Sequence, residues 1–308
     1  MPDIKLRCTA CGKRHLADSQ TYGTKANCQE CGAPLDTLCF TTPERTRAVA
    51  AAVKRNERKI ILDALVYPLM RIEPGRFFAG AETASPAESP EHEVCLTQPV
   101  WMGICPISQL EYRHIMRGNP SAFPGLDRPV ENVCWFEAQE FCQRLTKRLR
   151  KMHFLNDTLN VRLPTEAEWE YASRTHPPDK EESNPQESQG RRTISKYGWD
   201  DTLETLVEYA WFSGNSNEQT HPVGQKKANL RNLHDLHGNV SEWCEDWYAA
   251  YPADLQVNPQ GPASGTEKVR RGGSWASLAR RCRGTDRVGL NPQCRSALLG
   301  FRVVLAYT

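Results

Sequence analysis

Hydrophobic positions recur at helical spacing in the middle of the chain. Between residues 134 and 151, apolar side chains stand at i, i+3, i+4, i+7 and i+11, namely Ala138, Phe141, Cys142, Leu145 and Leu149. This spacing predicts an amphipathic helix with one buried face. Cys142 is then a core residue.

Two further helices are predicted from local signals. One runs from about Ser108 to Met116. Another begins at Thr165, which can form a capping box with Glu168 directly after Pro164. The polar stretch from 175 to 196 has no apolar period, so it predicts a surface loop.

The chain changes character near residue 66. The segment from 43 to 65 is rich in Ala, Arg, Lys and Glu, and after its first residue it has no Pro or Gly, so it predicts a helix. This helix is either a spacer or docking element between modules, or an ordinary solvated helix with one packed face. From 66 to 308, recurring Gly, Pro, Trp and Asn with short strands and long loops predict an irregular α+β domain.

Composition narrows the classes of function. The 308 residues are 39% hydrophobic and carry 39 basic against 37 acidic side chains, so no overall charge favours nucleic acid or a membrane surface. No apolar run approaches the roughly 18 to 20 residues of a membrane span, and the first residues lack the apolar core of a secretory signal. We expect a cytoplasmic protein without membrane contact.

Four of the twelve cysteines form a metal-binding pattern. They stand in two CxxC pairs separated by sixteen residues, Cys8 with Cys11 and Cys28 with Cys31. Four thiolates at this spacing suit a structural zinc ion, which predicts a zinc ribbon over 1–40 followed by a linker helix over 41–65. A redox CxxC normally occurs singly, and the remaining alternative is four unrelated reduced cysteines.

Six motifs in order resemble one known family. They are NPSAF at 119–123, RPVENVCWFEAQEFCQRL at 128–145, VRLPTEAEWEYASR at 161–174, LHDLHGNVSEWCEDWY at 233–248, RRGGSW at 270–275 and LGFRVV at 299–304. Residues 66–308 thereby resemble the formylglycine-generating-enzyme (sulfatase-modifying factor) family. The resemblance implies an α+β, C-type-lectin-like fold with two helices around short antiparallel sheets.

The resemblance also locates the family's oxidase thiols. Family members that oxidise a substrate cysteine use two copper-binding thiols five positions apart, and this chain has Ser277 and Cys282 there. A serine hydroxyl is a poor ligand for soft cuprous ion, so neither copper nor oxidase chemistry is expected. The alternative is an oxidase, or an inactive homologue acting as an accessory modifier, that works through Cys282 alone.

A calcium site is implied by the same resemblance. Its ligands would be the side chains of Asp235, Asn239 and Glu242 and the backbone carbonyls near Gly238 and Val240. Hard oxygen donors on a tight turn suit calcium. Alternatively, these side chains only hold a turn before a buried Trp stripe. The nearby histidines, His234 and His237, are expected to be loop-packing or solvated rather than metal ligands.

The C-terminal region is rich in arginine. Eight arginines face one acid between 270 and 302, at 270, 271, 280, 281, 283, 287, 295 and 302. Trp275 and Phe301 are its only aromatic residues, so few side chains could stack on bases and nucleic-acid binding is not expected. An adaptor that binds nucleic acid through the ribbon and these arginines remains the rival. The arginines at 280, 283, 287, 295 and 302 are expected to be buried or half-buried supports for loops.

The positions between the framework residues carry unrelated side chains. A fixed framework that includes Trp275 and Cys282, with arbitrary inserts, resembles the variable region of diversity-generating-retroelement variable proteins. The resemblance implies a non-enzymatic protein whose region 270–302 displays ligand-binding side chains, and Gly284 and Thr285 depart from a typical template. The candidate variable residues are Ala276, Ser277, Leu278, Arg281, Asp286, Val288, Gly289, Leu290, Asn291, Cys294, Ser296, Ala297 and Leu298.

A broad face of varied side chains suits a protein ligand better than an enclosed small molecule. The ribbon and linker helix would mediate assembly or attach a second partner. The competing interpretation is a degenerate, inactive member of the enzyme family without a display function.

Overall fold

The computed structural model describes residues 67–82, 85–151, 153–174 and 202–307, together with the backbone of short strands before residue 67. Near the N-terminus, β1 (Ile4–Arg7) pairs antiparallel with β2 (Arg14–Ala17), and β3 (Ala26–Asn27) with β4 (Pro34–Leu35). The four ribbon cysteines lie outside the described residues. In the sequence, each CxxC pair falls between two strands that pair.

A five-stranded antiparallel sheet forms one part of the domain. Its order is β10 (Leu159–Arg162), β16 (Val304–Tyr307), β9 (Val100–Gly103), β6 (Leu65–Ile72) and β5 (Arg58–Leu62). Every residue of β9 is buried, as a central strand requires. The C-terminal strand β16 lies between β10 and β9, so the two ends of the family domain meet in one sheet.

The linker-helix prediction is wrong at its C-terminal end. Residues 58–62 form strand β5, which pairs with β6 in register from Arg58 opposite Leu69 to Leu62 opposite Leu65. The sequence RKIIL carries two adjacent β-branched isoleucines, which suit a strand, and β6 supplies a hydrogen-bonding partner. The rest of the predicted helix, up to residue 57, lies outside the described residues.

The three helices predicted within the domain are confirmed. They are α2 (Gln109–Met116), α3 (Trp135–Lys151) and α4 (Glu166–Ser173). The capping box of Thr165 and Glu168 is present at α4, and Ser108 forms a second one at α2. A short helix that the sequence pattern did not reveal, α5 (Leu203–Tyr209), follows its cap Thr202. The predicted loop at 175–196 lies outside the described residues.

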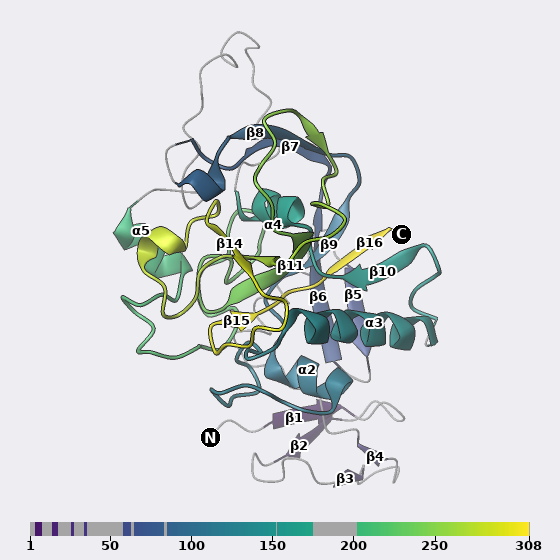
Figure 1. The fold of residues 1–308 in the computed structure, drawn as a ribbon. Coiled ribbons are helices and arrows are strands. Elements are labelled where there is room, and N and C mark those ends of the chain that lie inside the picture. The colour runs from purple at the N-terminus through teal and green to yellow at the C-terminus, as the bar shows by residue number, and fades with distance from the viewer. Residues whose placement is uncertain are drawn as a thin grey trace, which may run out of the picture.

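Two smaller sheets complete the fold (Figure 1). The first has the order β14 (Arg287–Leu290), β13 (Lys268–Arg271), β11 (Ser241–Trp247) and β15 (Leu299–Gly300), in which β15 runs parallel to β11. The second contains β12 (Gln256–Val257), β8 (His92–Leu96) and β7 (Gly75–Ala79). Short 3-10 turns, η2 (Pro86–Glu88) and η4 (Ala279–Arg281), stand in the connecting chain.

The hydrophobic core lies between the helices and the sheets. The buried face of α3 packs with Tyr112, Trp243 and Phe301 in one cluster, and Trp169 of α4 belongs to a second cluster. Cys142 lies in the first cluster, as predicted, and Cys244 in the second, while Cys134 is buried without belonging to either. Among the described residues, no helix combines the length and the apolar character that crossing a bilayer requires.

Candidate ligand-binding face

The variable region begins with a tight glycine turn after β13. Gly272 and Gly273 have φ values of 93° and 70°, a backbone region that glycine adopts without strain. A Cβ on Gly273 would lie 2.9 Å from the sulfur of Cys282. The close approach of turn and thiol explains why both positions are framework, and it holds Ala276 to Leu278 at the surface.

Trp275 joins two separated parts of the region. Its indole N–H donates to the carbonyl of Ala297 at 2.9 Å, and its ring lies edge-on to Phe123. The backbone N–H of Ser241 donates to Leu298 at 2.7 Å. Residues 276–278 and 296–298 therefore lie close together, although about twenty residues separate them in the sequence.

Most candidate variable residues differ in exposure from the buried part of the framework, although the framework residues Trp275, Arg280, Gln293 and Arg295 also reach the surface. Ala276, Leu278, Arg281 and Asn291 are exposed, with Leu278 at 51%. Eight others are half-buried, namely Ser277, Val288, Gly289, Leu290, Cys294, Ser296, Ala297 and Leu298. By contrast, the interspersed framework residues Cys282, Arg287, Leu299, Phe301 and Arg302 are buried. Twelve of the thirteen candidates thus reach the surface, and we call these twelve the display face.

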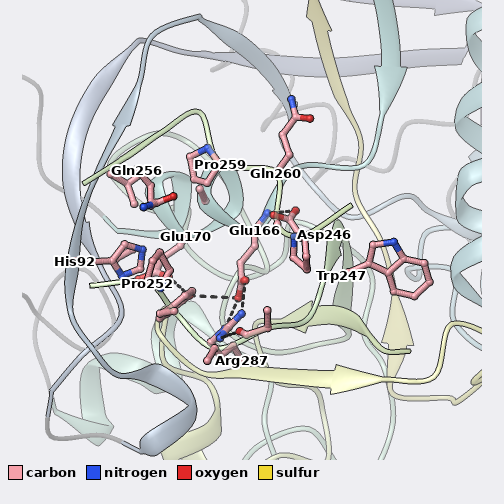
Figure 2. A pocket seen from close by; sticks show the side chains of 18 residues that line it. His92, Glu166, Glu170, Asp246, Trp247, Pro252, Gln256, Pro259, Gln260 and Arg287 are labelled. Atoms are coloured by element: carbon pink, nitrogen blue, oxygen red, sulfur yellow. Dashed lines mark hydrogen bonds and ion pairs between the residues drawn. The ribbon is translucent and has the colours of Figure 1, made fainter. Parts of the chain in front are cut away.

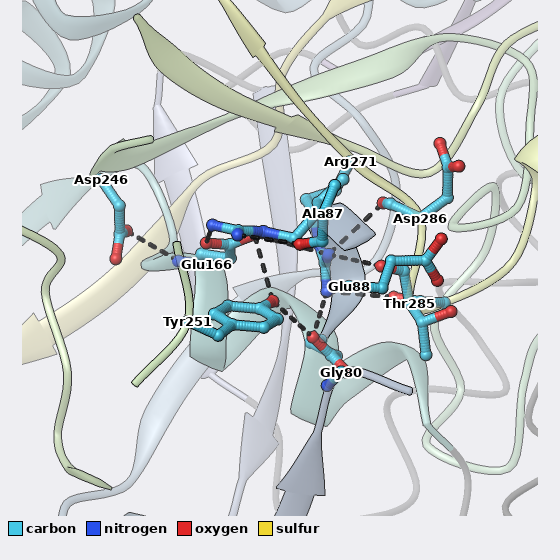
Figure 3. Close-up of polar contacts among 12 residues, drawn as sticks. Gly80, Ala87, Glu88, Glu166, Asp246, Tyr251, Arg271, Thr285 and Asp286 are labelled. Carbon is cyan, nitrogen blue, oxygen red and sulfur yellow. Dashed lines mark hydrogen bonds and ion pairs between the residues drawn. The ribbon is translucent and has the colours of Figure 1, made fainter. Parts of the chain in front are cut away.

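Asp286 is the exception. Its side chain is 4% exposed, and its carboxylate accepts a hydrogen bond from Arg281 at 3.0 Å. The carbonyl oxygens of Gly284, Thr285 and Asp286 accept hydrogen bonds from the buried guanidinium of Arg271 (Figure 3). Residues 284–286 therefore wrap Arg271 and form part of the framework. The prediction that Asp286 is a displayed variable residue is therefore wrong.

Within the display face, the half-buried strand β14 is more constrained than the loops. A Cβ added at Gly289 would lie 2.8 Å from the ring of Tyr248, so a larger residue needs that ring to move. Leu290 and Cys294 pack partly against the core cluster of α3. The four exposed positions thus all lie outside β14, whereas Leu290 of β14 and Cys294 of the following loop contact both core and solvent.

The arginine prediction is confirmed for the residues with buried acidic partners. Arg302 pairs with Glu242 at 2.6 Å, Arg287 with Glu166 at 2.6 Å and Arg283 with Glu88 at 2.6 Å. Arg280 and Arg295 are exposed, so the prediction is wrong for these two. Arg295 pairs with Glu137 at the surface, where both heads keep contact with water.

Cys282 is enclosed rather than accessible. Its side chain packs with Leu206, Ala210 and Phe212, and burial raises the pKa of the thiol to about 12. At the other thiol position of the family, the hydroxyl of Ser277 accepts a hydrogen bond from the Ser274 N–H at 3.0 Å. The pair therefore presents neither a thiolate nor a second soft ligand.

The implied calcium ligands are engaged with protein groups. Both carboxylate oxygens of Glu242 accept from Arg302, and one also accepts from the Trp169 indole at 2.7 Å. The amide of Asn239 exchanges two hydrogen bonds with the backbone of His221. Asp235 accepts from the N–H of Gly224 at 2.7 Å. Arg302 supplies the positive charge that a metal ion would bring to Glu242, and only Oδ1 of Asp235 among these side-chain oxygens lacks a hydrogen bond, so this donor set does not fit calcium.

Gly238 and Val240 contribute to packing at the same turn. A Cβ at Gly238 would lie 2.2 Å from the carbonyl oxygen of Trp211, and Val240 is fully buried. Nδ1 of His237 donates to the backbone carbonyl oxygen of Cys282 at 2.8 Å, and burial lowers the pKa of His237 to about 4. His234 makes a similar contact with Lys226. In the described chain, no group of three His, Cys, Asp or Glu residues converges on a possible metal position.

Sequence reasoning missed two aromatic residues beside the display face. Phe123 contacts Trp275, and Phe136 is half-exposed at the start of α3, where the Trp135 N–H donates to Pro292 at 3.0 Å. An exposed Phe on the polar side of an amphipathic helix was a usable signal, because such positions normally carry polar residues. The wider face thus includes fixed apolar contacts.

The architecture and the glycine turn define a C-type-lectin-like domain of mixed α+β type. Residues 65–307 match the sulfatase-modifying factor enzyme 1-like domain, and the chain belongs to this family. The family resemblance inferred from the six motifs is thereby confirmed. The family domain starts within one residue of the predicted boundary, while β5 extends its sheet further toward the N-terminus.

Several curated relatives match by sequence. The chain is 30% identical to the chaperone protein LppX of Paenibacillus barcinonensis, over 64% of this chain and 76% of the relative. It is 31% identical to the formylglycine-generating enzyme of Streptomyces coelicolor, over 57% of this chain and 52% of the enzyme. It is 28% identical to the serine/threonine-protein kinase pkn1 of Chlamydia caviae, over 84% of this chain and 41% of the kinase. The chain therefore spans about half, or less, of the latter two relatives.

Solved structures give the same fold. Treponema denticola variable protein 1 is 28% identical with a TM-score of 0.70, covering 81% of this chain and 98% of that protein. PvdO from Pseudomonas aeruginosa is 20% identical with a TM-score of 0.60, covering 79% and 95%, which supports the fold alone. The expected resemblance to variable proteins is confirmed by the first of these similarities.

Proposed function

We propose that this chain is a non-enzymatic ligand-binding protein that displays diversified side chains on a lectin-like scaffold in the cytoplasm. The contrast in exposure between the display face and its buried framework carries the proposal. Side chains that leave the core untouched can change at little cost in stability, whereas buried substitutions typically cost 1 kcal/mol or more. The similarity to a variable protein over 81% of the chain supports it.

A protein is the ligand class that fits this face best. The face mixes exposed apolar residues such as Leu278 with polar residues such as Asn291, and the half-exposed Phe136 follows Trp135, whose backbone N–H donates to Pro292. Protein interfaces combine aromatic and aliphatic anchors with a polar rim over a broad area. We further propose that the ribbon at 1–40 holds zinc and that the N-terminal part mediates assembly or binds a second partner.

Two matched libraries test the display function. One randomises the twelve residues of the display face, and the other randomises twelve buried framework positions of region 270–302. Both are displayed on yeast, scored for folding by protease resistance and selected against lysozyme as a probe protein. We expect most display-face variants to resist protease and to yield lysozyme binders. Equal loss of folding in the two libraries would contradict the proposal.

An oxidase acting through Cys282 is the alternative within the same family. The similarity to formylglycine-generating enzymes favours it, while the enclosed thiol and Ser277 oppose it. Copper titration and oxygen consumption with a cysteine-containing peptide distinguish the two functions. Stoichiometric cuprous ion bound through Cys282, with turnover of the peptide, would establish the oxidase and remove the display proposal.

A further inference from the structure

A cavity of about 400 Å³ lies between β8, the start of α4 and the chain that follows β11 (Figure 2). Part of its wall is apolar, with Val94, Ala167 and the prolines at 252, 259 and 262. Its size is within the range of small-molecule sites, which is about 300–1,000 Å³. Three carboxyl groups face it, those of Glu166, Glu170 and Asp246.

Two of these carboxyl groups are neutralised by arginine. Glu166 receives two hydrogen bonds from Arg287, both at 2.6 Å. Glu170 pairs with Arg271 and, at 2.5 Å, with Arg174, so that its pKa falls to about 2 despite burial. Both groups therefore already have positive partners and belong to the structural network of α4.

Asp246 differs from the other two. It stands near the end of β11 and is 4% exposed. One oxygen, Oδ2, accepts the backbone N–H of Glu166 at 2.7 Å. Among the described residues, no hydrogen bond reaches Oδ1 and no Lys, Arg or His forms an ion pair with the carboxylate. A buried carboxyl group with a free oxygen at a cavity wall is costly to ionise unless a cation approaches it.

The pKa of Asp246 agrees with this geometry. Burial is the largest cause and the negative charge of Glu166 the second, and together they raise the pKa to about 8. Without a ligand, the carboxyl group of Asp246 therefore keeps its proton at neutral pH. A ligand that brings its own positive charge can take the place of that proton.

We propose that this cavity binds a small organic cation, whose primary ammonium group donates to Oδ1 of Asp246 while its alkyl part lies against the proline-rich wall. A compact ammonium suits a single carboxylate oxygen, whereas a guanidinium requires two acceptors side by side. Pro252 and Pro259 also line the cavity and supply rigid apolar surface. The cation site does not depend on the display function, since no residue of the display face lines the cavity.

Calorimetric titration of the full chain with n-butylammonium chloride at constant ionic strength tests the site, with 1-butanol as the neutral ligand of similar shape. We expect saturable binding of the ammonium alone. The D246N variant keeps an oxygen that can accept the Glu166 N–H, and it should weaken binding at least about tenfold. The matched control is D254N, which changes an exposed aspartate of the chain that follows β11 and should bind as wild type.

A second variant guards against misfolding of the first. Ala250 is exposed at the cavity wall, so A250W fills the cavity without disturbing the core and should abolish binding while the melting temperature stays near wild type. Equal binding to wild type and D246N, equal binding of 1-butanol, or the absence of saturation would each overturn the cation site. None of these outcomes bears on the display libraries.

Discussion

Arg302 and Glu242 form a doubly hydrogen-bonded ion pair inside the core. Nε and Nη2 of the arginine lie 2.6 and 2.7 Å from the two carboxylate oxygens, and both side chains are essentially unexposed. The guanidinium also donates to the backbone carbonyls of Gly103 and His234. One buried arginine thus connects β9, β11 and the irregular loop that contains His234.

Breaking this pair should destabilise the domain strongly. R302M leaves the Glu242 carboxylate buried without its positively charged partner, which typically lowers the free energy of unfolding by about 3–5 kcal/mol. The matched control is R295M, because Arg295 is 45% exposed and pairs with Glu137 at the surface. Exposed pairs contribute about 0–1 kcal/mol. Urea unfolding of both variants measures the difference, and similar losses would contradict a supporting role for Arg302.

Substitutions on the display face should leave stability nearly unchanged. The triple variant A276S/L278S/V288S replaces two exposed residues and one half-buried residue, and surface changes usually stay within about 0.5 kcal/mol each. W275A removes the ring that holds Ala297 and contacts Phe123, so it should cost more than about 2 kcal/mol. Differential scanning calorimetry compares the two. A large drop for the triple variant would place its residues in the core.

Local signals in the sequence were sufficient for the helices. The apolar stripe of α3 and the capping box at Thr165 depend on neighbours within one or two turns, and the structure shows both. Strand β5 was missed because its pairing partner, β6, is a tertiary neighbour and the alanine-rich sequence before it favours a helix. Periodicity alone does not report such pairing.

The candidate site was predictable to a similar extent. The alternation of framework and inserted residues located the surface positions, since twelve candidates reach solvent. The burial of Asp286 was not predicted, because it depends on the guanidinium of Arg271, which donates hydrogen bonds to the carbonyls of residues 284–286. The role of Asp246 was not predicted, because its burial beside a cavity depends on residues of α4 and of the chain after β11. These residues are distant in sequence, so no sequence spacing indicates the contact.

Stability should fall with rising pH because of Asp246. Its pKa is about 8 in the folded chain against 3.8 for an unperturbed aspartate, owing to burial and then to the charges of Glu166, Glu168 and Glu245. Between about pH 4 and pH 8 the native state therefore holds a proton that the unfolded state has released, and the free energy of unfolding decreases as pH increases.

The D246N variant removes this titration. At neutral pH it should be more stable than wild type, because the unfolded state no longer gains from ionising the residue. Chemical denaturation at several pH values checks the slope, with D254N as the exposed control. A D246N slope identical to that of wild type would show that Asp246 ionises normally in the folded chain.

Cys282 should resist alkylation in the native protein. Thiolates react, and burial raises the pKa of this thiol to about 12 while Leu206 and Phe212 cover it. Cys95 and Cys294 are only partly buried and provide internal controls on the same chain. Brief treatment with iodoacetamide followed by peptide mass mapping should label these two before Cys282. If Cys282 were labelled as fast as Cys95, the result would support an oxidase that acts through Cys282.

Zinc should accompany the N-terminal cysteines. Each CxxC pair falls in the sequence between two short paired strands, and four thiolates suit one tetrahedral zinc ion. Elemental analysis of the purified chain should give one zinc per molecule. C8S/C11S should lose it, whereas C95S should retain it, because Cys95 lies in β8 of the family domain. Loss of the zinc should leave the melting transition of the lectin-like domain largely unchanged, because the core clusters of that domain consist of residues after 66. Full zinc content in C8S/C11S would assign the metal to other ligands.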